Sequence, residues 1–172
     1  GVRVVKAEGR IANLENRLGE SAFDGDAADL RVGIGHTRWA THGGPTEFNA
    51  HPHTDCHNGI AIVHNGIVEN FLELREELQA RGHVFSSQTD SECIPHLIEG
   101  YRLQDYPLED AVKETAGRVR GANAVLVASK KDPGKLVAFR LGNAGGIVVG
   151  YGDDEMFLAS DLPALLPHTR EV

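Results

Sequence analysis

The stretch that decides the fold class is Ile60-Ala-Ile-Val-His-Asn-Gly-Ile-Val-Glu-Asn-Phe71, together with the charged segment that follows it. Residues Ile60–His64 form a short apolar run, which predicts a buried strand. Over Ile67–Ala80, apolar side chains recur at helical spacing and charged side chains lie off that stripe. This part predicts an amphipathic helix that is capped by Gly82. A strand that passes through Asn65-Gly66 directly into a helix indicates a protein with both α and β layers.

Shorter segments before this stretch extend the pattern. Val2–Val5 and Val32–Arg38 are apolar and are expected as strands. Between them, Ile11–Leu18 carries apolar residues at helical spacing and predicts a short helix. The acidic segment Glu20–Asp29 is rich in small residues and is expected as an exposed loop.

After this stretch the chain changes from helices to hairpins. Thr89-x-x-Glu92 matches a capping box and is expected to start a helix through Ile98, and a further helix runs from Leu108 to Val119. Four apolar segments separated by turn signals then predict one antiparallel meander, at residues 124–128, 136–140, 147–151 and 156–159. This order of elements predicts an α+β fold with antiparallel sheets in one domain over residues 1–172, and not alternating βαβ units.

Composition limits the partners and the compartment. The chain has 172 residues, 41% of them apolar, and a net charge of −8. An acidic surface repels nucleic acids and anionic membranes, and no apolar run approaches the roughly 18–20 residues of a membrane span. Two cysteines, Cys56 and Cys93, do not make a disulfide framework. Free thiols predict a cytoplasmic protein.

The first candidate binding group is Arg38, which stands beside the chain's one tryptophan, Trp39. A guanidinium binds a carboxylate through two parallel hydrogen bonds, so Arg38 is a candidate for holding a substrate carboxylate with Trp39 as an aromatic cover. In the alternative interpretation Arg38 is a surface ion-pair donor and Trp39 is a core residue. Composition alone favours that alternative.

The second candidate is the Asn65-Gly66 pair at the expected helix start. A side-chain amide and a closely approaching backbone N–H at that position make an oxyanion hole. Asn-Gly is equally an ordinary turn or capping pair. Further along, Asp90 is able to bind a substrate ammonium group, or only to stabilise the helix N-terminus through its dipole.

Histidines are concentrated in one part of the chain, since six of the nine fall between His36 and His64. Within this part, His51-Pro-His53 with Asp55 and Cys56 offers residue types that suit zinc. The segment has neither a helical His-x-x-x-His pair nor a Cys-x-x-Cys pair, so we expect no metal and no organic cofactor. Neither Cys56 nor Cys93 is expected to be a nucleophile.

Four motifs of the chain are informative when they are taken together. They are Gly35-His-Thr-Arg-Trp-Ala-Thr-His-Gly43, Asn49-Ala-His-Pro-His53, His64-Asn-Gly-Ile-Val-Glu-Asn70 and Thr89-Asp-Ser-Glu92. In these motifs the chain resembles the glutaminase domain of the glucosamine-6-phosphate synthase family, a class II (type 2) glutamine amidotransferase domain. Phe157-Leu-Ala-Ser-Asp161 is similar to the end of the same domain, so the resemblance extends over nearly the whole chain.

The resemblance implies a fold and an activity. The fold is a four-layer αββα sandwich of the N-terminal-nucleophile (Ntn) hydrolase type, and the activity is hydrolysis of glutamine to glutamate and ammonia. The ammonia passes to fructose 6-phosphate on a sugar-phosphate isomerase half of the same enzyme, which is expected to be a homodimer when intact. No metal or cofactor is implied.

The resemblance also assigns roles to residues. Arg38 would hold the α-carboxylate of glutamine, Asp90 its α-amino group, and Asn65 and Gly66 would form the oxyanion hole. The remaining expected site residues are Trp39, Thr41, His42 and His51, of which His51 has no assigned role.

One departure from the family concerns the nucleophile. The family uses a cysteine at the mature N-terminus whose own amino group is the general base, whereas residue 1 here is Gly. We therefore expect that this sequence starts inside the family domain and has no glutaminase activity as written. Two alternatives stay open: a non-catalytic domain that binds glutamine or glutamate, and a His-rich metallohydrolase.

Overall fold

The stretch from residue 60 to residue 80 forms a strand and a helix, but with a longer connection than its sequence predicts. The computed structural model describes residues 2–20, 32–40 and 43–172. Strand β2 is Ile60–Gly66 and helix α2 is Phe71–Ala80, so the helix begins four residues later than predicted. The backbone N–H groups of Ile67 and Glu69 donate to the carbonyl groups of residues 122 and 120, and the N–H of Val68 donates to a carboxylate. These tertiary bonds replace the helical ones in this connection.

Strand β2 lies inside a four-stranded antiparallel sheet. The strand order is β1 (His53–Thr54), β2, β3 (Asn123–Ser129) and β4 (Leu136–Leu141). Residues 60–66 of β2 pair with residues 129–123 of β3 over their full lengths, although three helices separate the two strands in the sequence. The register places alternate apolar side chains of β2 and β3 on the same face of the sheet.

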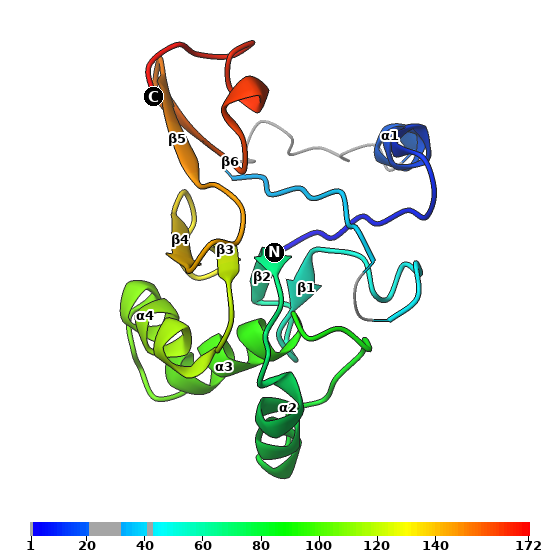
Figure 1. Cartoon of the computed structure of the whole chain (residues 1–172), viewed down its shortest axis with the longest axis vertical. Helices are drawn as coiled ribbons and strands as arrows, with labels where there is room; N and C mark the ends of the chain where they lie inside the picture. The colour runs from blue at the N-terminus through cyan, green and yellow to red at the C-terminus, as the bar shows by residue number, and fades with distance from the viewer. Residues whose placement is uncertain (1, 21–31, 41–42) are drawn as a thin grey trace.

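Three helices cover one face of this sheet (Figure 1). They are α2, α3 (Cys93–Arg102) and α4 (Leu108–Arg118), and all three were expected from their apolar spacing. A hydrophobic core lies between the helices and the sheet, and its completely buried members include Ile62, Val125, Val127, Ile94, Ile98 and Leu108. Pro95 is the third residue of α3, where the missing N–H costs no intrahelical bond.

The predicted meander is wrong at its middle, because β4 does not pair with the next strand. Strands β5 (Val148–Gly152) and β6 (Glu155–Ala159) form a separate two-stranded sheet, followed by a short 3₁₀ turn at Leu162–Ala164. The Nε of Arg140 donates to the carbonyl groups of residues 144 and 145, and these bonds hold the chain in a turn between the two sheets.

The second sheet faces the side of the main sheet that carries no helices. A cavity of about 260 Å³ lies between them, lined by Val63, Leu126 and Ala138 on one side and by Ile147 and Leu158 on the other. The described residues therefore show a layer of helices, a four-stranded sheet and a smaller sheet in succession. Helix α1 (Ile11–Glu20) lies apart from these layers in Figure 1.

The predicted N-terminal strands do not form in the described residues. Helix α1 confirms the short helix, but Val2–Val5 and Val32–Arg38 run as irregular chain without ladder hydrogen bonds among the described residues. An apolar segment becomes a strand only where a neighbouring strand satisfies its backbone. Most of the expected loop at Glu20–Asp29 lies outside the described residues. Among these residues, no helix has the length and apolar character needed to cross a membrane.

Candidate active site

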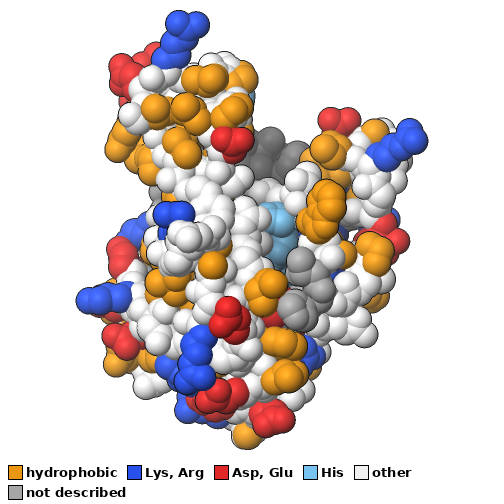
Figure 2. All heavy atoms as spheres, viewed as in Figure 1, with side chains coloured by type: hydrophobic (Ala, Val, Ile, Leu, Met, Phe, Trp, Pro, Cys, Tyr) orange, Lys and Arg blue, Asp and Glu red, His pale blue; other side chains and the backbone are white. Residues whose placement is uncertain are grey.

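A cavity of about 180 Å³ lies at the C-terminal end of β2. All predicted site residues that the structure describes line it, whereas Thr41 and His42 lie outside the described residues. Figure 2 shows histidine side chains exposed in a hollow near the middle of the visible face. The residues that line the cavity are His36, Thr37, Arg38, Trp39, His51, His64, Asn65, Gly66, Thr89, Asp90 and Ser91.

Asn65 is held in one orientation by a histidine from the irregular segment beside β2. The Nε2 atom of His36 lies 2.8 Å from the Oδ1 atom of Asn65. Burial lowers the pKa of His36, with the Asn65 bond opposing this effect, so the ring is neutral and its Nε2–H donates to Oδ1. The side-chain NH₂ group of Asn65 is then the edge that remains to act as a donor.

Gly66 is required by the packing of the chain at this point. Its φ angle is +136°, and a Cβ atom built there would lie 2.1 Å from the carbonyl oxygen of Ala122. Both observations exclude an L side chain. Asn65 and Gly66 are the last residues of β2 and do not stand at a helix N-terminus, so that part of the sequence interpretation is wrong.

Asp90 stabilises the backbone of the connection between β2 and α2, which follows Gly66. Its side chain is buried, and its Oδ2 accepts a 2.7 Å hydrogen bond from the backbone N–H of Val68. Helix α3 begins at Cys93 with Glu92 as its N-cap residue, so Asp90 is not a helix cap. The predicted capping box Thr89-x-x-Glu92 is also wrong, because no side-chain cap hydrogen bond forms.

Arg38 and Trp39 enter the cavity from the irregular segment. The guanidinium of Arg38 donates to the backbone carbonyl groups of Gly43 and Gly44, at 3.2 and 3.1 Å. The indole of Trp39 is 90% exposed, so the interpretation of Trp39 as a core residue is wrong. A fixed cation and an exposed aromatic group therefore stand at the rim of the same cavity as Asp90.

Asn49, which the sequence analysis did not single out, joins these two parts of the site. It is 2% exposed, its Nδ2 donates to the carbonyl of Gly44, and its Oδ1 accepts from the backbone N–H of Gln88. Gly44 also receives the Arg38 guanidinium, and Gln88 lies two residues before Asp90. One buried amide thus fixes the segments that carry the cation and the anion.

Four imidazole rings cluster at the inner end of the cavity. The ring of His51 lies 4.2 Å from that of His36, 4.8 Å from His53 and 6.4 Å from His64, between centroids. Burial is the largest cause that lowers the pKa of His51 far below its ordinary value, and the neighbouring rings add to it. Burial also lowers the pKa of His53 to about 3. The cluster is therefore neutral near pH 7.

His64 is fixed through both ring nitrogens. Its Nε2 lies 2.9 Å from the Oδ1 of Asn123, and its Nδ1 lies 2.8 Å from the hydroxyl of Ser91. A carbonyl oxygen only accepts, so Nε2 carries the proton and Nδ1 accepts from the serine. His64 thus ties β2 to β3 and to the segment before α3.

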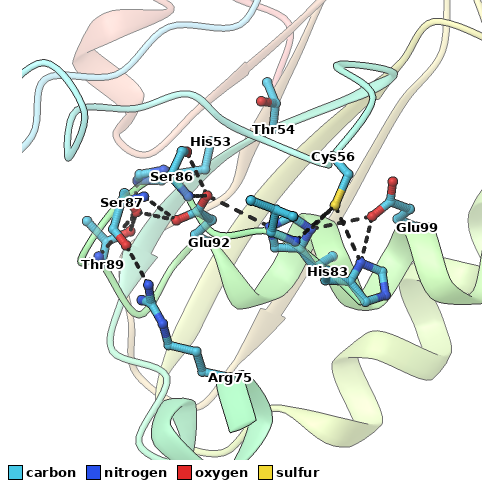
Figure 3. A network of polar contacts seen from close by, with 12 residues as sticks. His53, Thr54, Cys56, Arg75, His83, Ser86, Ser87, Thr89, Glu92 and Glu99 are labelled. Atoms are coloured by element: carbon cyan, nitrogen blue, oxygen red, sulfur yellow. Dashed lines mark hydrogen bonds and ion pairs between the residues drawn. The ribbon is translucent and has the colours of Figure 1, made fainter. Parts of the chain in front are cut away.

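The loop that carries Asp90 is organised by Glu92, another residue that the sequence analysis misassigned. One carboxylate oxygen accepts from the N–H and hydroxyl of Ser86, and the other accepts from the N–H and hydroxyl of Ser87, all at 2.6–2.7 Å. The hydroxyl of Ser87 contacts Thr89, whose hydroxyl contacts Nε2 of His53 (Figure 3). Burial opposes ionisation of Glu92, but these bonds hold its pKa at about 2.

Both cysteines lie outside this cavity, and the side chains of the candidate zinc segment do not converge. Neither Cys56 nor Cys93 is among the described residues that line it, and burial raises the pKa of Cys93 to about 12. In the segment from His51 to Cys56 the side chains diverge: His51 faces the cavity, His53 bonds to Thr89, and Asp55 accepts from the backbone N–H groups that follow its turn. These side chains do not form one metal site.

The cavity therefore combines a guanidinium, a carboxylate, an oriented amide and neutral imidazoles. A fixed cation and a fixed anion in one small cavity match a zwitterion, and an oriented amide donor matches a developing negative oxygen.

Comparison with known proteins agrees with this chemistry. The profile of the glutamine amidotransferase domain matches residues 36–167. The chain is 48% identical over 99% of its length to the glutamine–fructose-6-phosphate aminotransferase (isomerizing) of Methanothermobacter thermautotrophicus. It is 50% identical to the enzymes of that name from Symbiobacterium thermophilum and Thermus thermophilus, over 98% and 100% of its length. It spans only 26–28% of the length of these relatives.

Solved structures show the same relationship. The glutamine phosphoribosylpyrophosphate amidotransferase of B. subtilis is similar with a TM-score of 0.62 and 27% identity, over 76% of this chain and 28% of that one. A structure described as the allosteric regulatory enzyme of purine biosynthesis gives 0.63 and 28%, with the same coverage. The similarity confirms the predicted α+β fold of the Ntn hydrolase type. The chain therefore belongs to the glutamine amidotransferase domain family, and it corresponds to the glutaminase domain of its relatives, the isomerizing glutamine–fructose-6-phosphate aminotransferases.

Proposed function

We propose that this chain binds glutamine and supports its hydrolysis to glutamate and ammonia, and that the ammonia serves the amination of fructose 6-phosphate. In this proposal residues 1–172 are one type 2 amidotransferase domain of a longer enzyme with a sugar-phosphate isomerase half. Relatives of about 50% identity that carry the name of this reaction support it.

The observation that carries the proposal is that Arg38, Asp90 and Asn65 meet at one cavity. They are distant in the sequence, and ordinary surface ions or caps have no reason to converge. Arg38 would bind the α-carboxylate of glutamine and Asp90 its α-ammonium group. The side-chain amide would then extend toward the end of β2, where Asn65 lies.

In the family's reaction the thiolate of an N-terminal cysteine, which residues 1–172 do not supply, attacks the amide carbon of glutamine, and the C=O electron pair moves onto oxygen. The NH₂ group of Asn65 and the backbone N–H of Gly66 would donate to that oxyanion. The C–N bond then breaks, a proton goes to the departing nitrogen, and water cleaves the resulting thioester to give glutamate. His36 supports this role because it holds Oδ1 of Asn65 and leaves the NH₂ edge for the oxyanion.

The second candidate is a domain that binds glutamine or glutamate without hydrolysing it. The observation in its favour is that neither Cys56 nor Cys93 lines the described part of the cavity. The two candidates share the binding residues and differ only in the thiol. Ammonia release from glutamine by the longer enzyme of this proposal, and its loss after alkylation of a cysteine at the N-terminus of that enzyme, separates them.

The test of the binding site compares Asp90→Asn and Arg38→Met with the control Arg81→Met. Arg81 is exposed on the surface at the end of α2, where it pairs with Glu77. We expect the first two variants to weaken glutamine binding by about 2–5 kcal/mol in calorimetric titration, because each leaves one substrate charge unpaired. Synthesis driven by added ammonia should persist in both. Glutamine affinity like that of the Arg81 variant would exclude the assignment.

The proposal also includes a cytoplasmic location and a homodimer. The two free thiols, one of them exposed at Cys56, support a reducing compartment. Sedimentation of the purified protein measures the dimer directly, and a monomer at working concentration would contradict it.

A further inference from the structure

A second group of chemically reactive side chains lies away from the cavity. Cys56, His83, His96 and Glu99 each direct one N, O or S atom into a common space, and these four atoms lie within 4.8 Å of one another. They come from three parts of the chain: the turn between β1 and β2, the loop after α2, and helix α3. Figure 3 shows Cys56, His83 and Glu99 converging in this way.

We propose that these four side chains bind one zinc ion in a tetrahedral site. Three of the distances between the ligand atoms fit such an ion. With Zn–S of about 2.3 Å and Zn–N of about 2.0–2.1 Å, a tetrahedron has S···N edges of about 3.6 Å and N···O edges of about 3.3 Å. The Sγ of Cys56 lies 3.6 Å from Nδ1 of His96 and 3.8 Å from Nδ1 of His83, and Nδ1 of His96 lies 3.4 Å from Oε2 of Glu99.

One edge is shorter than a metal site needs. The Nδ1 of His83 is 2.7 Å from Oε2 of Glu99, which is a hydrogen bond. On binding zinc, this bond is replaced by two bonds to the ion, and the two atoms separate by about 0.6 Å. The proton of the Cys56 thiol leaves to solvent, and both imidazoles bind through Nδ1 with their protons on Nε2.

The charges of this ligand set balance. One thiolate, one carboxylate and two neutral imidazoles together carry −2, which neutralises Zn²⁺ at a site where His96 and Glu99 are almost fully buried. Thiolate and imidazole ligands favour zinc over magnesium or calcium, which prefer oxygen. Four protein ligands fill a tetrahedron, so the geometry points to a structural ion and not to a water-activating one.

Backbone and side-chain groups around the four ligands hold them in position, as hydrogen-bonding groups around the ligands do in known zinc sites. The backbone N–H of Val84 donates to Sγ of Cys56, and Nδ1 of His57 lies 2.7 Å from Oε1 of Glu99, which leaves Oε2 for the ion. The Nε2 of His96 is buried without a hydrogen bond and lies 3.8 Å from Oε1 of Glu92. With His96 bound to zinc through Nδ1, this Nε2–H faces the Glu92 carboxylate.

The experiment removes metal from the purified protein with a chelator, returns zinc or cobalt, and measures the bound metal by elemental analysis. We expect one zinc ion per chain, a raised melting temperature with zinc, and the absorption of a tetrahedral cobalt thiolate with cobalt. Cys56→Ser should lose the thiolate-to-cobalt band and the thermal shift. His57→Gln keeps all four ligands and should weaken zinc binding about 10–100-fold.

Controls are the other thiol and an exposed histidine, Cys93→Ala and His168→Gln, each checked for folding by circular dichroism. Both should bind zinc and cobalt as the unchanged protein does. Failure of the unchanged protein to take up stoichiometric zinc would overturn the proposal, and so would a Cys56→Ser variant that keeps the cobalt–thiolate band. The readouts do not involve glutamine, so they are independent of the proposed activity.

Discussion

Glu92→Gln is the most informative single substitution for the stability of the candidate active site. The carboxylate of Glu92 is 2% exposed, and it accepts four hydrogen bonds from two consecutive serines. Each oxygen accepts one backbone N–H and one hydroxyl. Glutamine has nearly the same shape, so the substitution changes charge and hydrogen bonding and leaves packing almost unchanged.

The magnitude follows from this arrangement. In either orientation of the amide, the new NH₂ group faces a backbone N–H, of Ser86 or of Ser87. A serine hydroxyl can rotate to accept, but a backbone N–H cannot, so one buried donor loses its partner at a cost of about 1–3 kcal/mol. The charge-assisted bonds that remain are also weakened. We expect a total loss of about 3–5 kcal/mol in the free energy of unfolding at pH 7.

The pH dependence provides an internal check. Burial raises the pKa of Glu92, but the hydrogen bonds from Ser86 and Ser87 and the nearby ring of His96 outweigh it, so the folded pKa is about 2, below the ordinary value of 4.5. A lowered pKa gives stability that is present above the unfolded pKa and is lost as the pH falls toward the folded one. The difference between the two proteins should therefore shrink between about pH 4.5 and pH 2.

Urea denaturation at pH 7 and at low pH measures this difference, with Glu73→Gln as the control. Glu73 is on α2, its side chain is 69% exposed, and it lies 3.8 Å from Arg120, so its substitution should change stability by less than about 0.5 kcal/mol. The reasoning is refuted by a loss below about 1 kcal/mol for Glu92→Gln at pH 7, or by a loss that stays constant as the pH falls.

Three further outcomes are expected. Asn49→Ala should lower the free energy of unfolding by about 2–3 kcal/mol in urea denaturation, because buried hydrogen bonds are lost. It should also weaken glutamine binding in calorimetry, because it releases the segments that hold Arg38 and Asp90. Unchanged glutamine affinity would contradict the positioning role of Asn49. Gly66→Ala should lower the free energy of unfolding by more than about 3 kcal/mol in the same assay, because its Cβ would meet a backbone carbonyl. Gly117→Ala in α4, which has open space around it, should raise this free energy by about 0.5–1 kcal/mol. Cys93 should react with iodoacetamide far more slowly than Cys56 when followed by mass spectrometry, since it is buried and its pKa is raised to about 12; equal rates would contradict the packing around it.

The sequence predicts the elements whose stabilising contacts follow a local period. Helices α2, α3 and α4 each carry an apolar stripe that matches the core face they bury, and β2 begins with four consecutive apolar residues. The predicted strand at Val32–Arg38 does not form, because an apolar run does not show whether a partner strand is present. The predicted start of α2 is wrong for a related reason, because the backbone N–H groups of residues 67–69 are bonded to residues that lie far away in the sequence.

Candidate site residues were identified where the motif was specific, and neighbouring residues of the same cavity were missed where the signal was only spatial. Arg38, Asp90 and Asn65 were recognised through their motifs, whereas their spacing alone favoured ordinary caps and surface ions. One hydrogen-bond partner of Asn49 lies 39 residues away, so the motif that begins at Asn49 does not by itself reveal the segments that this residue joins. Glu92 was given a helix-capping role because Thr-x-x-Glu is a local pattern, while its real partners precede it by five and six residues.

The proposed zinc site also shows that spacing in the sequence does not reveal which side chains meet in space. The sequence groups Cys56 with His51 and His53 because they are close in the sequence, but Cys56 lies in the turn after β1, where its Sγ contacts other histidines. The residues that meet Cys56 are His83 and His96, which lie 27 and 40 positions further on. Ligand sets of this kind require the helix and the loop to fold first, so a spacing rule for contiguous motifs does not find them.

The two sites are connected through the loop between α2 and α3. Starting from the metal cluster, Nε2 of His96 faces Glu92 at 3.8 Å, Glu92 holds Ser87 at 2.6 Å, and Ser87 contacts Thr89 at 3.0 Å beside the cavity. From the other side, Asn49 holds the backbone of the same loop at residue 88. A loop that is fixed at both ends keeps the Asp90 carboxylate in place without a ligand. A ligand that binds this carboxylate would therefore lose less free energy to the ordering of the loop. An ion at the cluster would act on glutamine only by holding this loop, since none of its four ligands lines the cavity.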